Sequence, residues 1–165
     1  MISFLKLIRY KNLLMVLLTL VLTKYALTNS YISQSFLSNL QFVLLATSIL
    51  CITAGGYIIN DIFDVKIDKI NKPDKVFIGN TISVKNAWSC YWSISIIGVV
   101  LGVFLSYDTN HTHYSFIFVF TSIMLYFYSK YFKKIAIIGN LFVSFFVGLS
   151  IYLISLFDLK LKLSQ

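Results

Sequence analysis

Charged residues, and acidic residues above all, are scarce in this chain. No glutamate occurs among the 165 residues, all six acids are aspartates, and charged residues make up only 12% of the sequence. Soluble globular domains contain roughly 25% charged residues. Since 58% of the residues are hydrophobic and the mean hydropathy is +0.83, the composition excludes an ordinary soluble domain and predicts an integral membrane protein.

Several common signatures are also missing. The only two cysteines, Cys51 and Cys90, fall within apolar runs, so we interpret them as small buried hydrophobic residues rather than metal ligands. The sequence contains no Walker loop, no Ser-His-Asp set and no low-complexity linker. The net charge of +8 is carried by basic residues that stand between the apolar runs, which indicates membrane topology and phosphate binding rather than nucleic-acid binding.

Five apolar runs are long enough to be considered as membrane spans, because about 20 residues cross the hydrocarbon core of a bilayer. They cover residues 12–28, 36–59, 86–106, 114–129 and 135–157. We therefore expect an all-α fold, with one membrane domain over residues 1–165 formed by a helical bundle of about five transmembrane helices. Lys24 stands near the far end of the first span, where its side chain is expected to snorkel towards the interface.

The basic residues predict how the chain is oriented in the membrane. Lysine and arginine concentrate in residues 6–11, 66–85 and 130–134, whereas residues 29–35 and 107–113 contain none. Positively charged loops stay on the cytoplasmic side. We therefore expect the N-terminus and an aspartate-rich loop at residues 60–85 to be cytoplasmic, in the inner membrane if the source is bacterial, and the C-terminus to lie outside.

Four of the six aspartates lie together directly after the second span, in residues 61–74. Asp61, Asp64 and Asp68 are spaced i, i+3, i+7, which places them on one face of a helix. Three like charges on one stripe repel each other unless a cation offsets the repulsion. Carboxylates suit Mg²⁺, which takes the rest of its shell from water and substrate phosphates. The stripe therefore predicts metal-bridged diphosphate chemistry at a bilayer surface.

The stripe has two other interpretations, and the sequence favours neither. The aspartates could pair with the interleaved lysines of a solvated helix, a stabilisation of roughly 0.2–0.5 kcal/mol per pair, but this does not explain why acids are absent almost everywhere else. A cation channel or carrier would place acids at mid-membrane, whereas these follow the end of a span. A calcium loop is excluded, because it needs acids at alternate positions around a central glycine.

Short motifs continue the pattern on both sides. The window reads Asn60-Asp61-x-x-Asp64-x-x-x-Asp68 and continues Ile-Asn-Lys-Pro-Asp-Lys over residues 70–75. Residues 79–83 read Gly-Asn-Thr-Ile-Ser, and residues 128–134, Tyr-Ser-Lys-Tyr-Phe-Lys-Lys, precede Gly139-Asn140. Together these motifs resemble the UbiA superfamily of intramembrane prenyltransferases, and the resemblance covers essentially the whole chain, including Arg9 and Asn12 at the first helix.

The resemblance implies a UbiA-type prenyltransferase fold that is incomplete. It implies transfer of a polyprenyl group from polyprenyl diphosphate to an aromatic or lipid-alcohol acceptor, with Mg²⁺ as cofactor. By this resemblance Asp61, Asp64 and Asp68 are the catalytic residues and the metal ligands. The implied diphosphate-binding residues are Asn60, Lys72, Lys75, Tyr128 and Lys133. Lysine in place of the family's usual arginine at positions 72 and 75 keeps the charge but loses bidentate contacts.

The chain departs from the family in length. Members are about twice as long and carry a second aspartate-rich motif on a later cytoplasmic loop, whereas the only acid after Lys134 is Asp158. By the predicted topology Asp158 lies on the opposite side of the membrane from the first motif. Two hypotheses follow. The chain is a prenyltransferase whose missing half comes from a second chain, or it is a truncated, non-catalytic membrane protein or assembly partner that keeps the fold.

Overall fold

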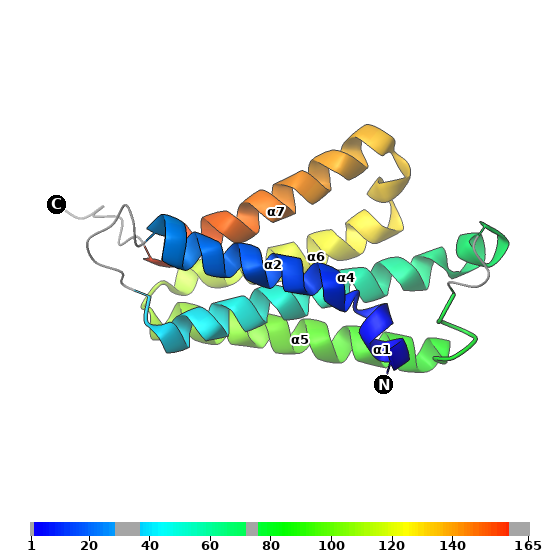
Figure 1. The fold of residues 1–165 in the computed structure, drawn as a ribbon, viewed down its shortest axis with the longest axis horizontal. Coiled ribbons are helices and arrows are strands. Elements are labelled where there is room, and N and C mark those ends of the chain that lie inside the picture. The colour runs from blue at the N-terminus through cyan, green and yellow to red at the C-terminus, as the bar shows by residue number, and fades with distance from the viewer. Residues whose placement is uncertain (1, 29–36, 72–75, 159–165) are drawn as a thin grey trace.

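The computed structural model describes residues 2–28, 37–71 and 76–158, and helices dominate that part of the chain (Figure 1). Its six α-helices are α1 (Ile2–Leu7), α2 (Tyr10–Leu22), α4 (Asn39–Asn71), α5 (Val84–Asp108), α6 (Ser115–Lys130) and α7 (Ala136–Asp158). A π-helical segment, η1 (Thr23–Thr28), continues α2, and the 3-10 turns η3 (Thr112–Tyr114) and η4 (Phe132–Lys134) precede α6 and α7. The predicted all-α class is confirmed.

Each predicted apolar span overlaps one of these helices, and α4 continues well beyond its span, to Asn71. Three of them, α4, α5 and residues Ile137–Asp158 of α7, are long and apolar enough to cross a membrane. The other two are shorter than the about 20 residues that a bilayer core requires, since α2 has 13 residues and α6 has 16. Within the described residues, the structure therefore supports a bundle with several candidate membrane spans.

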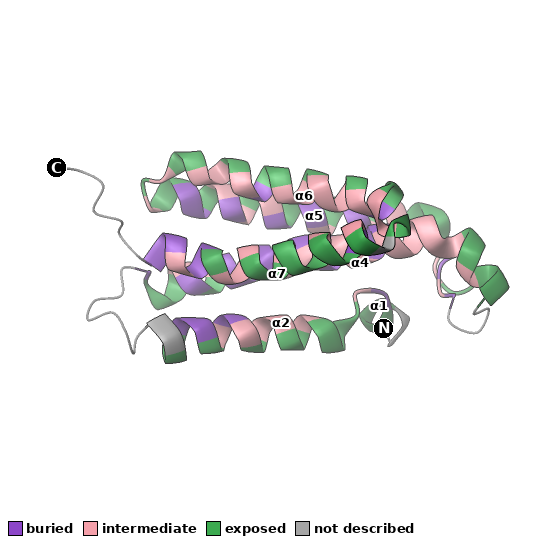
Figure 2. Cartoon of the chain, turned by 90° about the horizontal axis from the view of Figure 1, so that it is seen from above, coloured by how far each residue is buried: buried purple, intermediate pink, exposed green. Residues whose placement is uncertain are grey.

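The central helix of the bundle is α4. It packs along α5 and also contacts α6, α2 and α7. The buried share of the apolar stretch falls from 56% in α4 to 33% in α5 and 17% in α7. In Figure 2, exposed and partly buried residues alternate along most of α7, and buried residues gather at its last turns. The bundle is thus tightly packed around α4 and open along α7.

Glycines allow the close packing of α5 against its neighbours. A Cβ atom added to Gly98 would lie 2.8 Å from Cγ1 of Ile52 on α4, and one added to Gly102 would overlap the ring of Phe118 on α6. Ser48 uses the same close approach to donate a 2.6 Å hydrogen bond to the Gly98 carbonyl. The Gly98-x-x-x-Gly102 pattern therefore serves packing within the bundle, as small residues do where helices approach closely.

A buried ion pair joins the last turn of α7 to the segment that follows α2. Lys24 Nζ donates a 2.9 Å hydrogen bond to Oδ2 of Asp158 and another of 2.9 Å to the Leu37 carbonyl. Oδ1 of Asp158 accepts from the Leu37 backbone N–H, also at 2.9 Å. The Lys24 residue is 2% exposed and Asp158 is 0% exposed. The prediction that Lys24 snorkels is wrong, because a buried carboxylate lies within its reach.

This ion pair determines where α7 meets the rest of the bundle. In Figure 1, α7 lies close to α2 at the end where Asp158 stands and diverges from the other helices towards its beginning. At the converging end, residues of α4, α5, α6 and α7 join Leu20 and Leu37 in one buried apolar cluster: Leu20, Leu37, Phe42, Leu45, Ala46, Ile49, Ile52, Leu105, Phe118, Leu153, Ile154, Leu156 and Phe157. Beyond this cluster the helices leave an open wedge.

The substitution Lys24→Met should destabilise the folded chain, because it leaves the buried Asp158 carboxylate without its cationic partner. Breaking a buried pair from one side costs about 3–5 kcal/mol. Lys85→Met, which removes an exposed lysine from the first turn of α5, is the matched control and should change stability by less than about 0.5 kcal/mol. Thermal melting in detergent compares the two.

Adding Asp158→Asn to Lys24→Met should recover part of the lost stability. The side-chain carbonyl of asparagine can still accept a hydrogen bond from the Leu37 N–H, and no unpaired charge then remains buried. Equal melting temperatures for Lys24→Met and Lys85→Met would show that the buried pair of Lys24 and Asp158 does not stabilise the fold.

Candidate functional site

The aspartate motif lies on the last turns of α4. The sequence predicted a loop over residues 60–85, but α4 continues to Asn71, so the first half of that segment is helical. No glycine or proline interrupts residues 57–71, and the helix ends two residues before Pro73, as expected from the clash of a proline ring with a preceding helical turn. The helix therefore presents Asp61, Asp64 and Asp68 on one face.

Arg9 reaches this face from the break between α1 and α2. Its backbone is left-handed, with φ 52° and ψ 54°, and this conformation separates the two helices. Nη2 of Arg9 donates a 2.7 Å hydrogen bond to Oδ1 of Asp61. The guanidinium carbon lies 5.2 Å from the centroid of the Tyr57 ring, within the range of a cation–π contact. One cation of the chain therefore already offsets the charge of Asp61.

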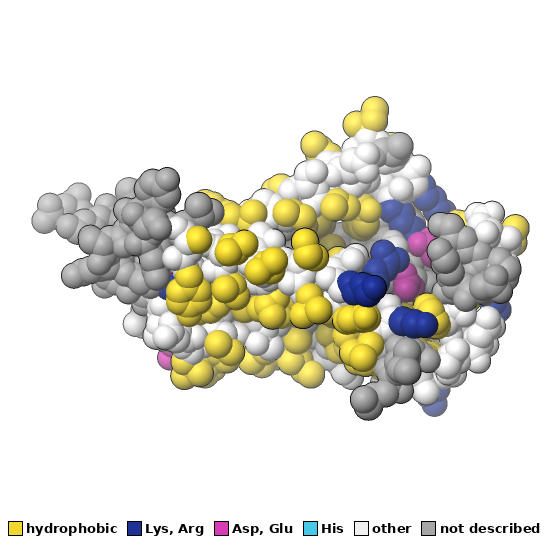
Figure 3. All heavy atoms as spheres, in the orientation of Figure 1, with side chains coloured by type: hydrophobic (Ala, Val, Ile, Leu, Met, Phe, Trp, Pro, Cys, Tyr) yellow, Lys and Arg dark blue, Asp and Glu magenta, His cyan; other side chains and the backbone are white. Residues whose placement is uncertain are grey.

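Lys133, in the short turn η4 between α6 and α7, reaches the same face from the other side. Its Nζ lies 2.6 Å from Oδ1 of Asp64. It also donates to the side-chain oxygen of Asn60 at 3.1 Å and to the Asn60 carbonyl at 3.3 Å. The sequence predicted these three residues as members of one site, and the structure brings them into direct contact. Lysines and aspartates gather at this end of the molecule (Figure 3).

A second buried cluster holds the neighbouring elements around the end of α4. It joins α1, α4, the turn at residues 76–82 and α5 through Leu7, Ile58, Ile59, Ile78, Ala87 and Tyr91. Gly79 closes the turn by donating to the Ile82 carbonyl at 2.7 Å, with φ +92°, a conformation that favours glycine. Ser83 then caps α5 by accepting from the Asn86 N–H. Burial of Leu7 places Arg9, two residues later, beside the motif.

A cavity of about 380 Å³ opens beside the motif, between α2, α4, α6 and α7. Its lining residues on α4 follow the pattern i, i+3, i+4, i+7, i+8, i+11 of one helical face: Ile49, Ile52, Thr53, Gly56, Tyr57 and Asn60. Its lining residues on α6 are spaced in the same way: Phe118, Thr121, Leu125 and Tyr128. The wedge between α7 and the other helices is therefore a defined apolar cavity.

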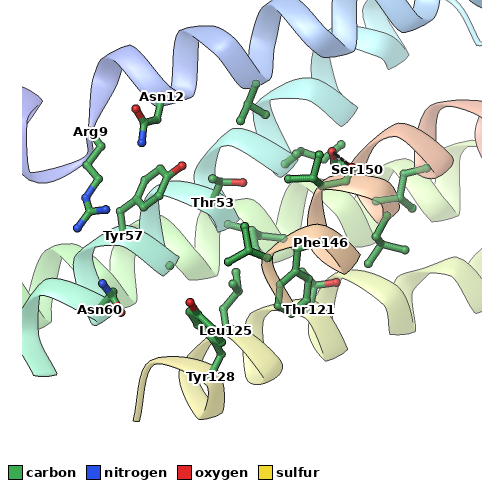
Figure 4. A pocket seen from close by; sticks show the side chains of 18 of the residues that line it. Arg9, Asn12, Thr53, Tyr57, Asn60, Thr121, Leu125, Tyr128, Phe146 and Ser150 are labelled. Carbon is green, nitrogen blue, oxygen red and sulfur yellow. Dashed lines mark hydrogen bonds between the residues drawn. The ribbon is translucent and has the colours of Figure 1, made fainter. Parts of the chain in front are cut away.

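One end of this cavity is polar and the other is apolar. Arg9, Asn12 and Asn60 lie together at one end, with the Tyr128 hydroxyl near them (Figure 4). Towards the other end the walls are formed by Ile49, Phe118, Leu149 and Leu153, with Ser150 among them. Such a cavity suits an amphiphile with an anionic head at the motif and an apolar tail between the helices.

The predicted site residues are placed as follows. Asn60 and Tyr128 line the mouth of the cavity. Asp61, Asp64 and Lys133 adjoin it, because Asp61 pairs with the lining residue Arg9 and Lys133 joins Asp64 to Asn60. Asp68 lies one turn further along α4 and, with Asp61, lines a small hollow beside residues 76–78. Lys72 and Lys75 lie outside the described residues. Arg9 was not among the predicted site residues, although the family resemblance included it at the first helix.

The carboxylates of the motif supply only part of the ligand set that a magnesium ion needs. Among the described residues, no three His, Cys, Asp or Glu side chains come close enough together to hold a metal by themselves. Mg²⁺ needs only one or two protein carboxylates when phosphate and water supply the remaining ligands. Asp61 and Asp64, each now paired with a cation, fit that role.

Relatives of this chain are digeranylgeranylglyceryl phosphate synthases. The synthase of Sulfurisphaera tokodaii is 37% identical over 114 residues, which cover 68% of this chain and 39% of the relative. That of Methanococcus aeolicus is 36% identical over 140 residues, or 79% of this chain and 48% of the relative. The chain thus spans about half the length of the curated relatives it matches.

A solved structure, from work on the biosynthesis of digeranylgeranylglyceryl phosphate synthase in membranes, has the same arrangement of helices. It superposes with a TM-score of 0.79 at 27% identity, over 95% of this chain and 53% of the other. Since the UbiA prenyltransferase family also matches residues 13–157, the chain belongs to the UbiA prenyltransferase family.

Proposed function

We propose that this chain takes part in Mg²⁺-dependent transfer of a geranylgeranyl group from its diphosphate to a glycerol-phosphate lipid. The observation that carries the proposal is the junction of the aspartate motif with the apolar cavity, where Arg9 and Lys133 flank the carboxylates. The names of the relatives favour a glycerol-phosphate acceptor over the aromatic acceptors that also occur in the family.

Each residue of the site has a distinct part in this proposal. Asp61 and Asp64 would hold the metal together with phosphate and water, Asp68 would add a carboxylate one turn further along α4, and Asn60 would orient the diphosphate. Lys133, together with Lys72 and Lys75, neutralises the remaining phosphate charge as a point charge. Tyr128 narrows the mouth of the cavity beside Asn60. When bound, Mg²⁺ neutralises the charge that develops on the leaving diphosphate.

The reaction breaks the bond between the allylic carbon and the diphosphate oxygen, and the electron pair leaves with the diphosphate. The acceptor hydroxyl oxygen then forms a new bond to that carbon, and its proton passes to solvent. The apolar walls of α4, α6 and α7 keep water from the electron-poor allylic carbon. Preorganised cations at the mouth stabilise the charge on the leaving group, which is commonly a large contribution to catalysis.

In the membrane, we place all five predicted spans across the bilayer as one domain over residues 1–165. Three helices are long and apolar enough to cross a membrane by themselves. The other two spans would be α2 together with η1, and α6. The motif end of the bundle, with its lysines and Arg9, faces the cytoplasm, as the distribution of basic residues favours.

A non-catalytic role is the second candidate function. It is favoured by the absence of any three-ligand metal group among the described residues. In the enzymatic proposal, polypeptide outside these 165 residues, such as a second chain, supplies the opposing carboxylates.

Replacing Asp64 tests the mechanism. Purified protein is given geranylgeranyl diphosphate, a geranylgeranylglyceryl phosphate acceptor and Mg²⁺, and product is measured by mass spectrometry. Asp64→Asn should lower the rate at least about 100-fold, because it removes a carboxylate that would hold the metal, and the negative charge on the leaving diphosphate is then less well neutralised. Asp108→Asn, at the exposed end of α5, should retain the rate.

Turnover that survives both Asp64→Asn and removal of Mg²⁺ would refute the mechanism. A chain that binds magnesium and diphosphate but forms no product even together with the polypeptide that supplies the opposing carboxylates would instead support the non-catalytic role.

Arg9→Gln should strengthen the binding of Mg²⁺ and weaken the binding of diphosphate. Removing the cation that pairs with Asp61 should tighten binding of Mg²⁺ alone by up to about fivefold, because an exposed pair contributes at most about 1 kcal/mol. Binding of inorganic diphosphate in the presence of Mg²⁺ should weaken, because a phosphate-facing cation is lost. Isothermal titration measures both, with Lys11→Gln on the exposed side of α2 as control. Weaker binding of Mg²⁺ alone would show that Arg9 does not compete with the metal.

A further inference from the structure

We propose that Phe118 forms the floor of the cavity and limits the length of the prenyl chain that the site accepts. This inference rests on the proposed function, because it assumes that the cavity holds a prenyl tail whose diphosphate lies at the aspartate motif. It concerns the end of the cavity opposite the reacting atoms, so Phe118 is a specificity residue and not a catalytic one.

The floor is formed where the four lining helices converge. At that end the cavity is lined by Val16 of α2, Ile49 of α4, Phe118 of α6 and Leu153 of α7. The last three belong to the buried cluster that closes the wedge, and Phe118 is 1% exposed. A tail that enters from the motif therefore meets a packed apolar layer and not an open channel.

Helix geometry gives the depth of the cavity. From Asn60 at the mouth to Ile49 at the floor, α4 advances eleven residues, or about 16 Å at 1.5 Å per residue. From Tyr128 to Phe118, α6 advances ten residues, or about 15 Å. The lengths along α4 and α6 agree, so both helices place the floor at about the same distance from the motif.

The Phe118 ring is held in place from behind. A Cβ atom on Gly102 of α5 would overlap the ring, so the absence of a side chain at position 102 creates the space that the ring fills. On another side the ring of Phe157 lies 6.1 Å away, centroid to centroid. Adding a methyl group at position 102 should therefore push the ring into the cavity, and truncating the ring should lengthen the cavity.

The test measures binding and does not require turnover. The purified 165-residue chain is titrated, with Mg²⁺ present, with geranyl, farnesyl, geranylgeranyl and geranylfarnesyl diphosphates, and the ratios of the dissociation constants are compared. Phe118→Ala should shift the preference towards the longer chain by about tenfold, as a change of a methylene or two in an apolar pocket does. Gly102→Ala should shift it towards the shorter chains.

Two further variants keep the result interpretable. Phe116→Ala removes a phenylalanine from the exposed face of the same helix and should leave the ratios unchanged. Phe118→Leu keeps most of the apolar volume if the alanine variant does not fold, and should shift the ratios in the same direction by a smaller factor.

The outcomes separate this inference from the proposed function. If the folded chain binds no prenyl diphosphate at all, the proposed function fails and this inference fails with it. If it binds them with ratios that Phe118→Ala and Phe118→Leu leave unchanged, only the floor is refuted, because the tail then leaves the cavity sideways into the lipid.

Discussion

The buried pair of Lys24 and Asp158 is the constraint on which the shape of the bundle depends. It joins residues 134 positions apart and also binds both backbone groups of Leu37, so it ties three segments together at one end. Because α7 is held there and diverges towards its beginning (Figure 1), the helices enclose a cavity that is closed at one end and open beside the aspartate motif. The pair acts together with the buried residues Leu153, Ile154, Leu156 and Phe157 of the last turns of α7, whereas only 17% of the apolar stretch of this helix is buried.

At the opposite end, the carboxylates on one face of α4 repel one another. The chain offsets this repulsion with two cations from distant elements, Arg9 before α2 and Lys133 before α7. Both are positioned by neighbouring structure: burial of Leu7 places Arg9, and the turn η4 places Lys133. These side chains hold the carboxylates in a compact arrangement, and the same positive charges suit a diphosphate. One set of residues thus accounts for both the stability and the proposed chemistry of the site.

The sequence predicted what local patterns encode and missed what distant contacts decide. The i, i+3, i+7 spacing correctly placed Asp61, Asp64 and Asp68 on one helical face, and hydropathy located all five helical regions. The family resemblance grouped Lys133 with Asn60 and Asp64. Lys24 was predicted to snorkel, because the sequence gives no sign that Asp158 lies beside it. Likewise, nothing local to Arg9 indicates Asp61, 52 residues away, and the predicted loop overlooked how far α4 continues before Pro73.

The most direct test of the central claim, that the motif binds a metal-bridged diphosphate whose tail enters the cavity, is pulsed electron paramagnetic resonance. Mn²⁺ replaces Mg²⁺ in the purified chain, and geranylgeranyl thiodiphosphate serves as an unreactive donor. The account predicts a phosphorus hyperfine coupling from directly bound phosphate, which disappears in Asp64→Asn and persists in Asp108→Asn. Mn²⁺ that binds the unsubstituted chain without any phosphorus coupling, or a coupling unaffected by Asp64→Asn, would contradict it.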